Sequence, residues 1–395
     1  MNAISTHNWY SSIGKIDDLQ IDIVHDINYL KAEWCELFEQ GNAFIFQHFD
    51  WVKLALETIE VNNQSLIITA RDDNQLIFIL PLVLVPGSPN IIRWVGASHA
   101  NLCVGIYDRS FLNALDPMCI PKTLQLIANT LPGAISLHLQ NQPHEIYNFD
   151  NPVNILPYQP SSAIMHEIDL SEGFEAVLNH GNGKRKRKIF RRQERISQEM
   201  GGYSLSTLTD PDEIRQTLDV FFELKRIRFD EIGVRDVFSD QQTKDFLQAL
   251  AFETKQNSNQ MLRLYVLEVG GKMRALYGCG IHQNHCHACI NAITYDDFSK
   301  ESPGEMIVYL LVQKLKDEGI TSLDFGAGDE RYKRSWSTSS QQLQETIVSL
   351  TRSALVYALF DSAKSRLKSR IRNHPKLWAA AAKVIRKQLA NKAKQ

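Results

Sequence analysis

The chain has 395 residues, of which 44% are hydrophobic and 22% are charged, and its formal net charge is -2. This composition is typical of a globular protein and excludes wholesale disorder. Its length exceeds what one compact core usually holds, so two domains are expected. Six cysteines without regular spacing do not suggest a disulfide framework, and they favour a reducing, cytoplasmic location.

The N-terminal segment has no basic start followed by an apolar run, so a secretory signal is not expected. A helix that crosses a bilayer needs roughly 20 apolar residues, and no stretch approaches that length. The longest apolar stretch, residues 76–85, contains Pro81 and suits a buried strand.

The small net charge hides two basic segments. Residues 352–395 hold 12 Lys and Arg against one acidic residue, and residues 184–195 hold eight against one. The remainder of the chain is therefore acidic. Basic segments of this kind suggest contact with phosphate groups or with an anionic surface.

In the first half, residues 1–20 are polar and aperiodic, and we expect a loose arm there. Helical periodicity covers residues 27–56, and strand-like runs follow it. The expected strands are 65–70, 75–85, 91–95 and 134–139, with a helix at 121–129 before the last of them. Residues 141–160 are rich in Pro and Asn and form the expected linker.

The second half repeats this order of helices followed by strands. Its expected helices are 184–199, one opening at Asp210-Pro211, 241–253 and 305–318. Its expected strands are 203–207, 261–269, 273–282, 286–295, 322–325 and 346–350. We predict a mixed-sheet α/β fold divided into an arm (1–20), two domains (21–160 and 161–350) and a tail (351–395). The shared order makes an internal duplication a hypothesis.

The segment from Tyr295 to Trp336 holds the features that point to chemistry. Ser302 is an expected N-cap, Pro303 fits the first helical position, and Gly304 lets a ligand approach the backbone. A helix start presents free amides and a positive dipole end, which suits a phosphate. Capping alone also explains these three residues.

An antiparallel meander, then a helix, then a parallel return strand is the order found in GNAT acyltransferases. The pattern also resembles the CelD/FemAB-type acetyltransferases. In the N-terminal half the matching residues are Glu33-Trp34, Phe44 to Trp51 and Leu80-Pro81-Leu82. In the C-terminal half they are Lys188, Arg191, Arg192, Ser302-Pro303-Gly304, Leu323-Asp324-Phe325-Gly326, Gly328-Asp329-Glu330, Tyr332-Lys333 and Trp336. The resemblance covers most of residues 20–350.

This resemblance implies tandem GNAT-like domains followed by a basic helical tail. It implies an acyl-CoA such as acetyl-CoA as donor, bound in the second domain near Tyr295, Ser302, Pro303 and Gly304, and no metal. The acceptor would be an amine of a small molecule, a sugar or a cell-envelope precursor. The phosphate loop departs from the usual GNAT pattern, because it offers only Gly304 with Lys300 nearby, and Glu301 and Glu305 would repel a pyrophosphate.

Direct transfer from a thioester needs a base for the amine, donors for the oxyanion and a proton for the thiolate. Asp329 and Glu330 follow a strand end, where a carboxylate can act as base or hold an ammonium group. Lys333 could neutralise a phosphate or the oxyanion, and Tyr332 could protonate the leaving group. A solvated loop with a local ion pair is an equally weighted interpretation.

His282, His285, Cys286, His287 and Cys289 resemble a metal cluster in composition. They straddle an expected hairpin, and strand alternation separates Cys286 from His287 and Cys289. We therefore expect no zinc site. His282 or His287 is instead a candidate base that faces the acceptor, because histidine titrates near neutrality.

The basic segment at 184–195 is a solvated helix in one interpretation. In another, Lys188, Arg191 and Arg192 bind an anionic substrate or donor phosphate. The tail forms an apolar face on a first helix to Ile371 and, after Pro375, on a second at 378–389. It either lies on an anionic membrane surface or packs on the acidic body, so a cytoplasmic location peripheral to the membrane is possible.

We therefore predict an acyl-CoA-dependent N-acyltransferase. A second interpretation is an aminoacyl-tRNA-dependent FemAB-type transferase, in which the basic helix contacts phosphates; nucleic acid is otherwise not an expected partner. A third is a non-catalytic protein that keeps the GNAT fold, because fold alone does not establish activity.

Overall fold

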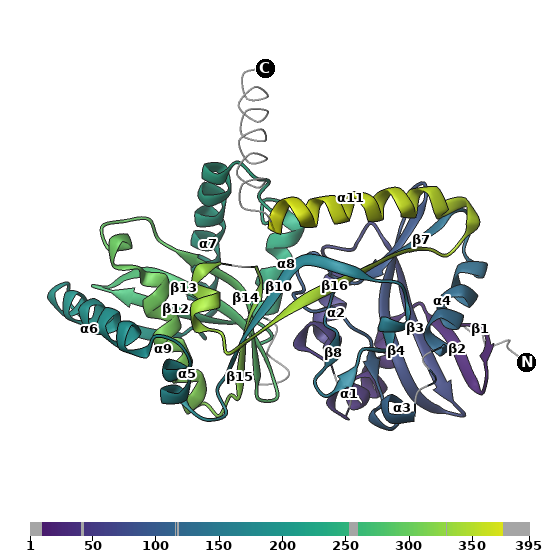
Figure 1. Ribbon diagram of the computed structural model, residues 1–395, viewed down its shortest axis with the longest axis horizontal. Helices are drawn as coiled ribbons and strands as arrows, with labels where there is room; N and C mark the ends of the chain where they lie inside the picture. Colours follow the sequence, from purple (N-terminus) through teal and green to yellow (C-terminus); the bar gives the residue numbers. More distant parts are fainter. Residues whose placement is uncertain are drawn as a thin grey trace, which may run out of the picture. The chain divides into compact units, whose positions relative to one another are not determined.

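The structure is a computed structural model that describes residues 10–40, 43–114, 116, 118–252, 260–328 and 330–373. These residues fall into two compact units. The first unit comprises the chain up to Ser162 together with Gln342–Arg370, and the second comprises Ala163–Gln341. The chain leaves the first unit within β10 (Gln159–Asp169) and returns to it within β16 (Ser339–Ser349), as Figure 1 shows.

The first unit is built on a sheet with the strand order β1, β2, β3, β4, β5, β7 and β16. Neighbours are antiparallel except β5 and β7, which are parallel. The strands are β1 (Tyr10–Ile16), β2 (Leu19–Val24), β3 (Gln64–Asp72), β4 (Gln75–Val85), β5 (Asn90–Trp94) and β7 (Ile135–Gln142). The unit also has three short strands. β6 (Ile106–Tyr107) pairs with β4, whereas β8 (Glu145–Ile146) and β9 (Phe149–Asp150) form a separate two-stranded hairpin.

Helices cover this sheet and bury large aromatic side chains against it. They are α1 (Lys31–Gln40), α2 (Phe49–Glu57), α3 (Arg109–Ala114), α4 (Cys119–Thr130) and α11 (Leu355–Asn373). Trp34, Trp51 and Trp94 are almost completely buried. The predicted helices and strands of this half are confirmed, including the polar turn between β3 and β4, where Asp73 has a φ of 49°.

Three sequence predictions differ from this unit. Residues 10–20 are not a loose arm, because β1 pairs with β2 from Tyr10 onward; residues 1–9 lie outside the described part. The expected linker 141–160 contains β8, β9 and the start of β10. Residues 344–349 pair with β7 in the first unit, although they were assigned to the second domain. The pairing of β16 with β7 joins distant segments, which local periodicity does not report, whereas β1 and β2 are neighbours in the chain.

The second unit has the strand order β10, β15, β14, β13, β12 and β11. Here β14 and β15 are parallel, and the other pairs with a known register are antiparallel. The strands are β11 (Tyr203–Thr207), β12 (Arg263–Val269), β13 (Lys272–His282), β14 (His285–Ile293) and β15 (Ser322–Ala327). The helices are α5 (Phe174–His180), α6 (Gly183–Glu199), α7 (Pro211–Ile232), α8 (Gln241–Phe252), α9 (Pro303–Asp317) and α10 (Arg331–Trp336).

Local sequence explains several boundaries of this unit. The Asp210 carboxylate accepts hydrogen bonds from the amides of Asp212 and Glu213, so it caps α7. Gly233 ends the same helix in the left-handed conformation. Gly270 and Gly271 both have positive φ, as a two-residue hairpin turn between β12 and β13 requires. The predicted helices and strands of this half are confirmed, whereas α5, β10 and α10 were not predicted.

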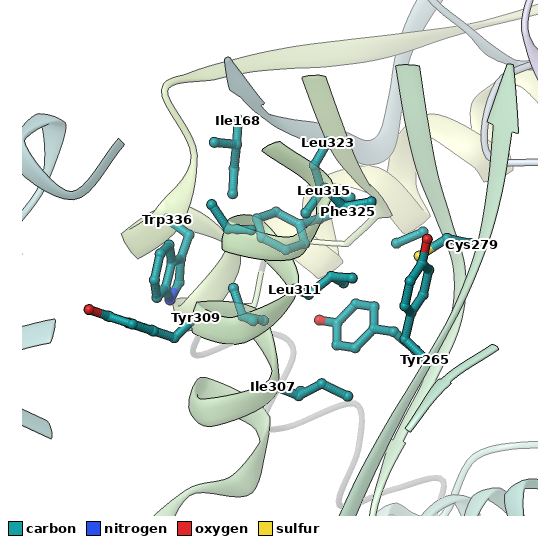
Figure 2. Packing of buried hydrophobic residues seen from close by; sticks show 14 of the residues in the cluster. Ile168, Tyr265, Cys279, Ile307, Tyr309, Leu311, Leu315, Leu323, Phe325 and Trp336 are labelled. Atoms are coloured by element: carbon teal, nitrogen blue, oxygen red, sulfur yellow. The ribbon is translucent and has the colours of Figure 1, made fainter. Parts of the chain in front are cut away.

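Helix α9 forms the centre of the second core. Figure 2 shows Trp336 and Tyr309 on one side of this helix and Tyr265 with Cys279 on the other. Tyr309 also stacks on Phe190 of α6 with ring centroids 4.0 Å apart. The packing fixes the direction in which the N-terminal end of α9 points, because the helix is held on both sides.

Among the described residues, no helix is both long enough and apolar enough to cross a membrane. The first helix predicted in the tail is α11, and the second, at 378–389, lies outside the described residues.

Candidate active site

The parallel strands β14 and β15 separate part-way along their length. They pair from His285 and Ser322 to His287 and Asp324. Beyond these positions β14 continues to Ile293 and β15 to Ala327 without further registered pairs between them. The strand ends therefore open into a cleft, and the helix that connects the two strands, α9, begins beside it.

A bulge in β14 lies just before this cleft. Gly278 of β13 pairs with Ile290, whereas Cys279 pairs with Ala288, so Cys289 is an extra residue on β14. Bulges re-aim the following side chains and occur often beside active sites. Here the bulge precedes Asn291 and Ile293, which line the cavity described next.

The cleft contains a cavity of about 560 Å³. Its walls come from α7, β13, the end of β14, the loop and first turn of α9, and the segment after β15. The lining residues are Leu224, Lys225, Arg228, Tyr277, Asn291, Ala292, Ile293, Tyr295, Ser299, Ser302, Gly304, Glu305, Glu330 and Tyr332. Five predicted site residues thus meet in one place: Tyr295, Ser302, Gly304, Glu330 and Tyr332.

Two tyrosines form a hydrogen-bonded pair in the wall. The Tyr277 hydroxyl donates to the Tyr332 hydroxyl oxygen at 3.0 Å. Burial raises the pKa of Tyr332 to about 12 and holds the pKa of Tyr277 well above its usual value. Both hydroxyls are therefore protonated at neutral pH, and Tyr332 retains a proton that it can donate.

The start of α9 differs from the predicted cap in one detail. Ser302 is the N-cap residue and Pro303 follows it, as predicted, but the Ser302 hydroxyl caps no amide of the described first turn. Ser302 has a φ of 59°, and it lines the cavity. A Cβ added at Gly304 would lie 3.5 Å from Ile293 Cγ2, an ordinary contact. Glycine is thus not required at this position by packing within the protein.

The two glutamates expected to repel a phosphate have different surroundings. Glu301 is buried and pairs with Arg192 of α6 at 2.9 Å. Glu305 lines the cavity and accepts a hydrogen bond from Trp336 Nε1 at 3.0 Å. The charge of Glu301 is therefore compensated within the protein, whereas Glu305 presents its carboxylate to the site.

Lys333 is buried and lies outside the cavity lining. Its Nζ donates to the Ala327 carbonyl at 3.1 Å and to the Gly326 carbonyl at 3.4 Å, and it lies 3.2 Å from Glu330 Oε2. This ammonium group closes the turn between β15 and α10 and holds the carboxylate of Glu330. Asp329, the other predicted carboxylate of this segment, lies outside the described residues.

The Asp324 side chain fixes the end of β15 through its contacts with Gly326 and His287. Its carboxylate accepts from the Gly326 amide at 2.8 Å and lies 3.3 Å from Nδ1 of His287. Glu167 lies beside this pair, and burial raises the pKa of its carboxyl group. These contacts suit a structural role for Asp324 at the end of β15.

Comparison with known proteins adds to this geometry. Residues 184–334 match the family model described as an acetyltransferase (GNAT) domain. This part of the second unit is therefore similar to GNAT acetyltransferase domains. No curated protein sequence matches the chain.

Solved structures extend the likeness to most of the chain, at the level of the fold. FemX is 12% identical with a TM-score of 0.56, covering 80% of this chain and 96% of FemX. A conserved protein of unknown function from Bacteroides thetaiotaomicron VPI-5482 is 12% identical with a TM-score of 0.53, covering 83% of this chain and 99% of that one. L-PGS from Bacillus licheniformis is 13% identical with a TM-score of 0.50, covering 87% of this chain and 97% of L-PGS.

The protein is therefore a transferase whose second unit resembles a GNAT domain and whose fold, over most of the chain, resembles that of FemX. Both units share the order of helices, three antiparallel strands, a helical connection and one parallel strand; the connection holds α3 and α4 in the first unit and α9 in the second. These matches do not separate a CelD-type member from other GNAT proteins.

The cleft of the GNAT domain has a closed equivalent in the first unit. There β5 and β7 pair from Asn90 to Arg93, and the loop after β5 is bound to the end of β7. Gln140 Nε2 and Asn141 Nδ2 donate to the Ala97 carbonyl, and the Cys103 amide donates to the Asn141 carbonyl. In this unit the described chain itself therefore closes the corresponding gap between the two parallel strands.

The cavity residues that were not predicted from the sequence include Lys225, Arg228, Tyr277 and Asn291. Lys225 and Arg228 project from one face of α7, since they are three residues apart. Burial lowers the pKa of Lys225 to about 8, although Glu330 opposes this shift. Asn291 is a polar residue in the otherwise apolar strand segment INAI. It is the one local signal that could have indicated that this strand lines a cavity.

The remaining predicted site residues lie elsewhere. His282 is buried at the opposite end of β13, five residues from Tyr277 and hence about 16 Å along the strand. Among the described residues, the His and Cys cluster around it does not form a set of ligand atoms close enough to hold an ion. Lys188, Arg191 and Arg192 are exposed on α6, outside the cavity lining.

Proposed function

We propose that the protein transfers an acyl group from an acyl-CoA to an amine, by direct attack in the cleft between β14 and β15. The single observation that carries this proposal is the separation of the two strands beyond His287 and Asp324 at the N-terminal end of α9. An extended thioester can lie between such strands, where free backbone groups are available to bind it.

The donor is proposed to enter with its phosphates near the start of α9. Ser302 offers a hydroxyl, Gly304 permits close approach of the backbone, and the helix dipole favours an anion. Tyr295, which is 47% exposed at the cavity, provides a flat surface for the donor. Pro303 is buried and only sets the direction of the helix.

Proton movements are assigned to three side chains. Glu330 holds the acceptor ammonium group, and the neutral form of Lys225 removes its proton, because a base with a pKa near the working pH is most effective. The amine nitrogen then forms a bond to the thioester carbonyl carbon. The carbon–sulfur bond breaks, Tyr332 donates its proton to the departing thiolate, and the attacking nitrogen releases its second proton to solvent, which leaves a neutral amide. The Tyr277 hydroxyl stabilises the resulting tyrosinate until solvent reprotonates it.

The acceptor class is proposed as a primary amine on a small molecule, a sugar or a cell-envelope precursor. Glu305 and Glu330 favour a cationic amine, whereas Lys225 and Arg228 favour an anionic group on the same molecule. We place the reaction in the cytoplasm, where acyl-CoA is available and where free thiols such as the six cysteines persist.

Titration calorimetry with acetyl-CoA and with longer acyl-CoAs tests donor binding. The expected result is saturable binding that is weakened by Gly304→Ala, followed by release of free CoA when amines are added. An absence of heat and of any thermal shift with every acyl-CoA would contradict the proposal.

A second candidate is aminoacyl transfer from a charged tRNA. It is favoured by the presence of Glu305 in the first turn of α9, where a carboxylate would repel a pyrophosphate. It is also favoured by the basic residues that α6 exposes, which are Lys184, Arg185, Lys188, Arg191 and Arg195. FemX shares the fold over 80% of this chain, which is compatible with this alternative. Filter binding with charged and uncharged tRNA distinguishes the two donors. Salt-sensitive tRNA binding without acyl-CoA binding would favour the second candidate.

A further inference from the structure

Helix α11 packs on the first unit through a face of small and polar residues. Ala358 and Ser369 are buried, and the contacts around them are polar. These contacts are Asp361 Oδ2 to His138 Nδ1 (3.4 Å), Ser362 Oγ to Gln159 Oε1 (2.9 Å), Arg366 Nε to Gln159 Oε1 (2.6 Å) and Ser365 to Glu345. The helix, drawn in yellow in Figure 1, is thus attached to the first unit mainly by hydrogen bonds.

The opposite face of α11 is apolar and exposed to solvent. The exposed fractions are 53% for Leu355, 80% for Val356, 64% for Leu359, 70% for Phe360 and 59% for Leu367. Residues three, four and seven apart lie on one side of a helix, so these side chains form one continuous stripe. The usual arrangement of a surface helix is reversed here, since the apolar face points away from the core.

Such a stripe differs from scattered exposed hydrophobic residues. Single apolar side chains on a surface are common, whereas a contiguous apolar patch marks an interaction site. The polar contacts on the packed side keep α11 in this orientation. A partner must therefore come to the helix from outside the first unit.

The charge of the helix selects the partner. The exposed residues Lys364, Arg366, Lys368 and Arg370 follow the apolar stripe along the same helix. The segment 352–395 as a whole holds 12 basic residues and one acidic residue. A second copy would bring two basic helices together, which is unfavourable. An anionic lipid surface offers acyl chains to the stripe and phosphates to the cations.

We propose that α11 docks the protein on an anionic membrane surface, with its apolar stripe at the acyl-chain boundary and its basic residues on the lipid phosphates. The occupant of the stripe is thus lipid. This surface is separate from the cleft of the GNAT domain, and its occupancy does not depend on the reaction proposed above.

Vesicle co-sedimentation with the full chain tests this proposal. Vesicles of phosphatidylcholine alone are compared with vesicles that contain about one-third phosphatidylglycerol, at low and high salt. We expect binding to the anionic vesicles, at least tenfold weaker binding to the neutral ones, and a decrease with salt. The variant Leu359→Ser/Phe360→Ser should bind the anionic vesicles at least tenfold more weakly.

Matched controls keep the result interpretable. Val61→Ser removes another exposed apolar side chain of the first unit and should leave vesicle binding unchanged. Both changes are at exposed positions, so the thermal unfolding curves should match that of the parent protein. Absence of binding to anionic vesicles, or equal binding by the Leu359/Phe360 variant, would overturn the proposal. A dimer in sedimentation velocity that dissociates in this variant would assign the stripe to a second copy instead.

Discussion

The hydroxyl of Tyr277 donates a hydrogen bond of 3.0 Å to the hydroxyl of Tyr332 in the wall of the candidate active site. This direction leaves the proton of Tyr332 available to the cavity. Burial raises the pKa of Tyr332 to about 12, so the hydroxyl is protonated throughout the neutral range. A half-buried donor of this kind, at the wall of a cavity, suits protonation of a leaving thiolate.

We therefore expect Tyr332→Phe to lower kcat about 100-fold while the KM values for donor and acceptor change little. The phenyl ring keeps the packing of Tyr332 against Phe325. Steady-state release of CoA measures both constants. Tyr295→Phe is the control, because Tyr295 also lines the cavity but is assigned to donor contact. If Tyr295→Phe abolished activity while Tyr332→Phe kept full activity, the two roles would have to be exchanged.

Gly304 gives a test of the donor site that spares the fold. The added Cβ of Gly304→Ala meets Ile293 at an ordinary contact distance, and alanine favours the helix more than glycine does. We expect unchanged or slightly higher thermal stability together with a severalfold higher KM for the acyl donor. Equal donor affinity in calorimetry would show that no ligand approaches the backbone at this position.

The sequence allowed the second half to be predicted in detail because its elements carry local signals. Asp210-Pro211 opens α7 and Gly270-Gly271 closes a hairpin, and both features act through neighbouring residues. The pairing of β16 with β7 joins residues about 200 positions apart, so no local pattern reports it. The early strand β1 was missed for a different reason: its sequence, YSSIGKI, is largely polar, although its partner β2 begins only a few residues later.

Site residues were predicted from the sequence where they lie at the start of a helix or after the end of a strand. Ser302, Gly304, Glu330 and Tyr332 met this condition and line the cavity. Lys225 did not, because a lysine on an amphipathic helix is indistinguishable in sequence from a solvated charge. His282 was an attractive residue by type, but the direction of β13 carries it to the far end of the strand.

Lys333 provides a prediction about stability. Its ammonium group is 4% exposed and binds the carbonyls of Gly326 and Ala327. We expect Lys333→Met to lower the free energy of unfolding by about 1–3 kcal/mol, since the carbonyls lose a buried donor. Activity should also fall, because Glu330 loses the group that holds it. Urea denaturation measures the first effect and CoA release the second.

Arg331→Met is the matched control for Lys333→Met, since Arg331 is exposed on the same short helix. It should change the free energy of unfolding by less than about 0.5 kcal/mol. Comparable destabilisation by the two variants would mean that the buried contacts of Lys333 contribute nothing specific to the turn.

Lys225 links activity and stability to pH. Burial lowers its pKa from 10.5 to about 8, so the folded protein releases the proton before the unfolded chain does. Between these values the unfolded state binds more protons, and the contribution of Lys225 to stability rises with pH. Below about pH 8 the buried charge opposes folding. We therefore expect Lys225→Met to raise Tm at pH 7, and the gain to shrink as the pH approaches 10.

The same group should govern the rate. If neutral Lys225 removes the acceptor proton, kcat/KM rises as the pH increases through about 8, and Lys225→Met abolishes this limb. Lys244→Met is the control, because Lys244 also lies over a phenylalanine ring but stands outside the cavity lining. A retained limb in Lys225→Met, together with a raised Tm, would leave Lys225 as a buried wall residue and transfer the role of base to another group of the cleft.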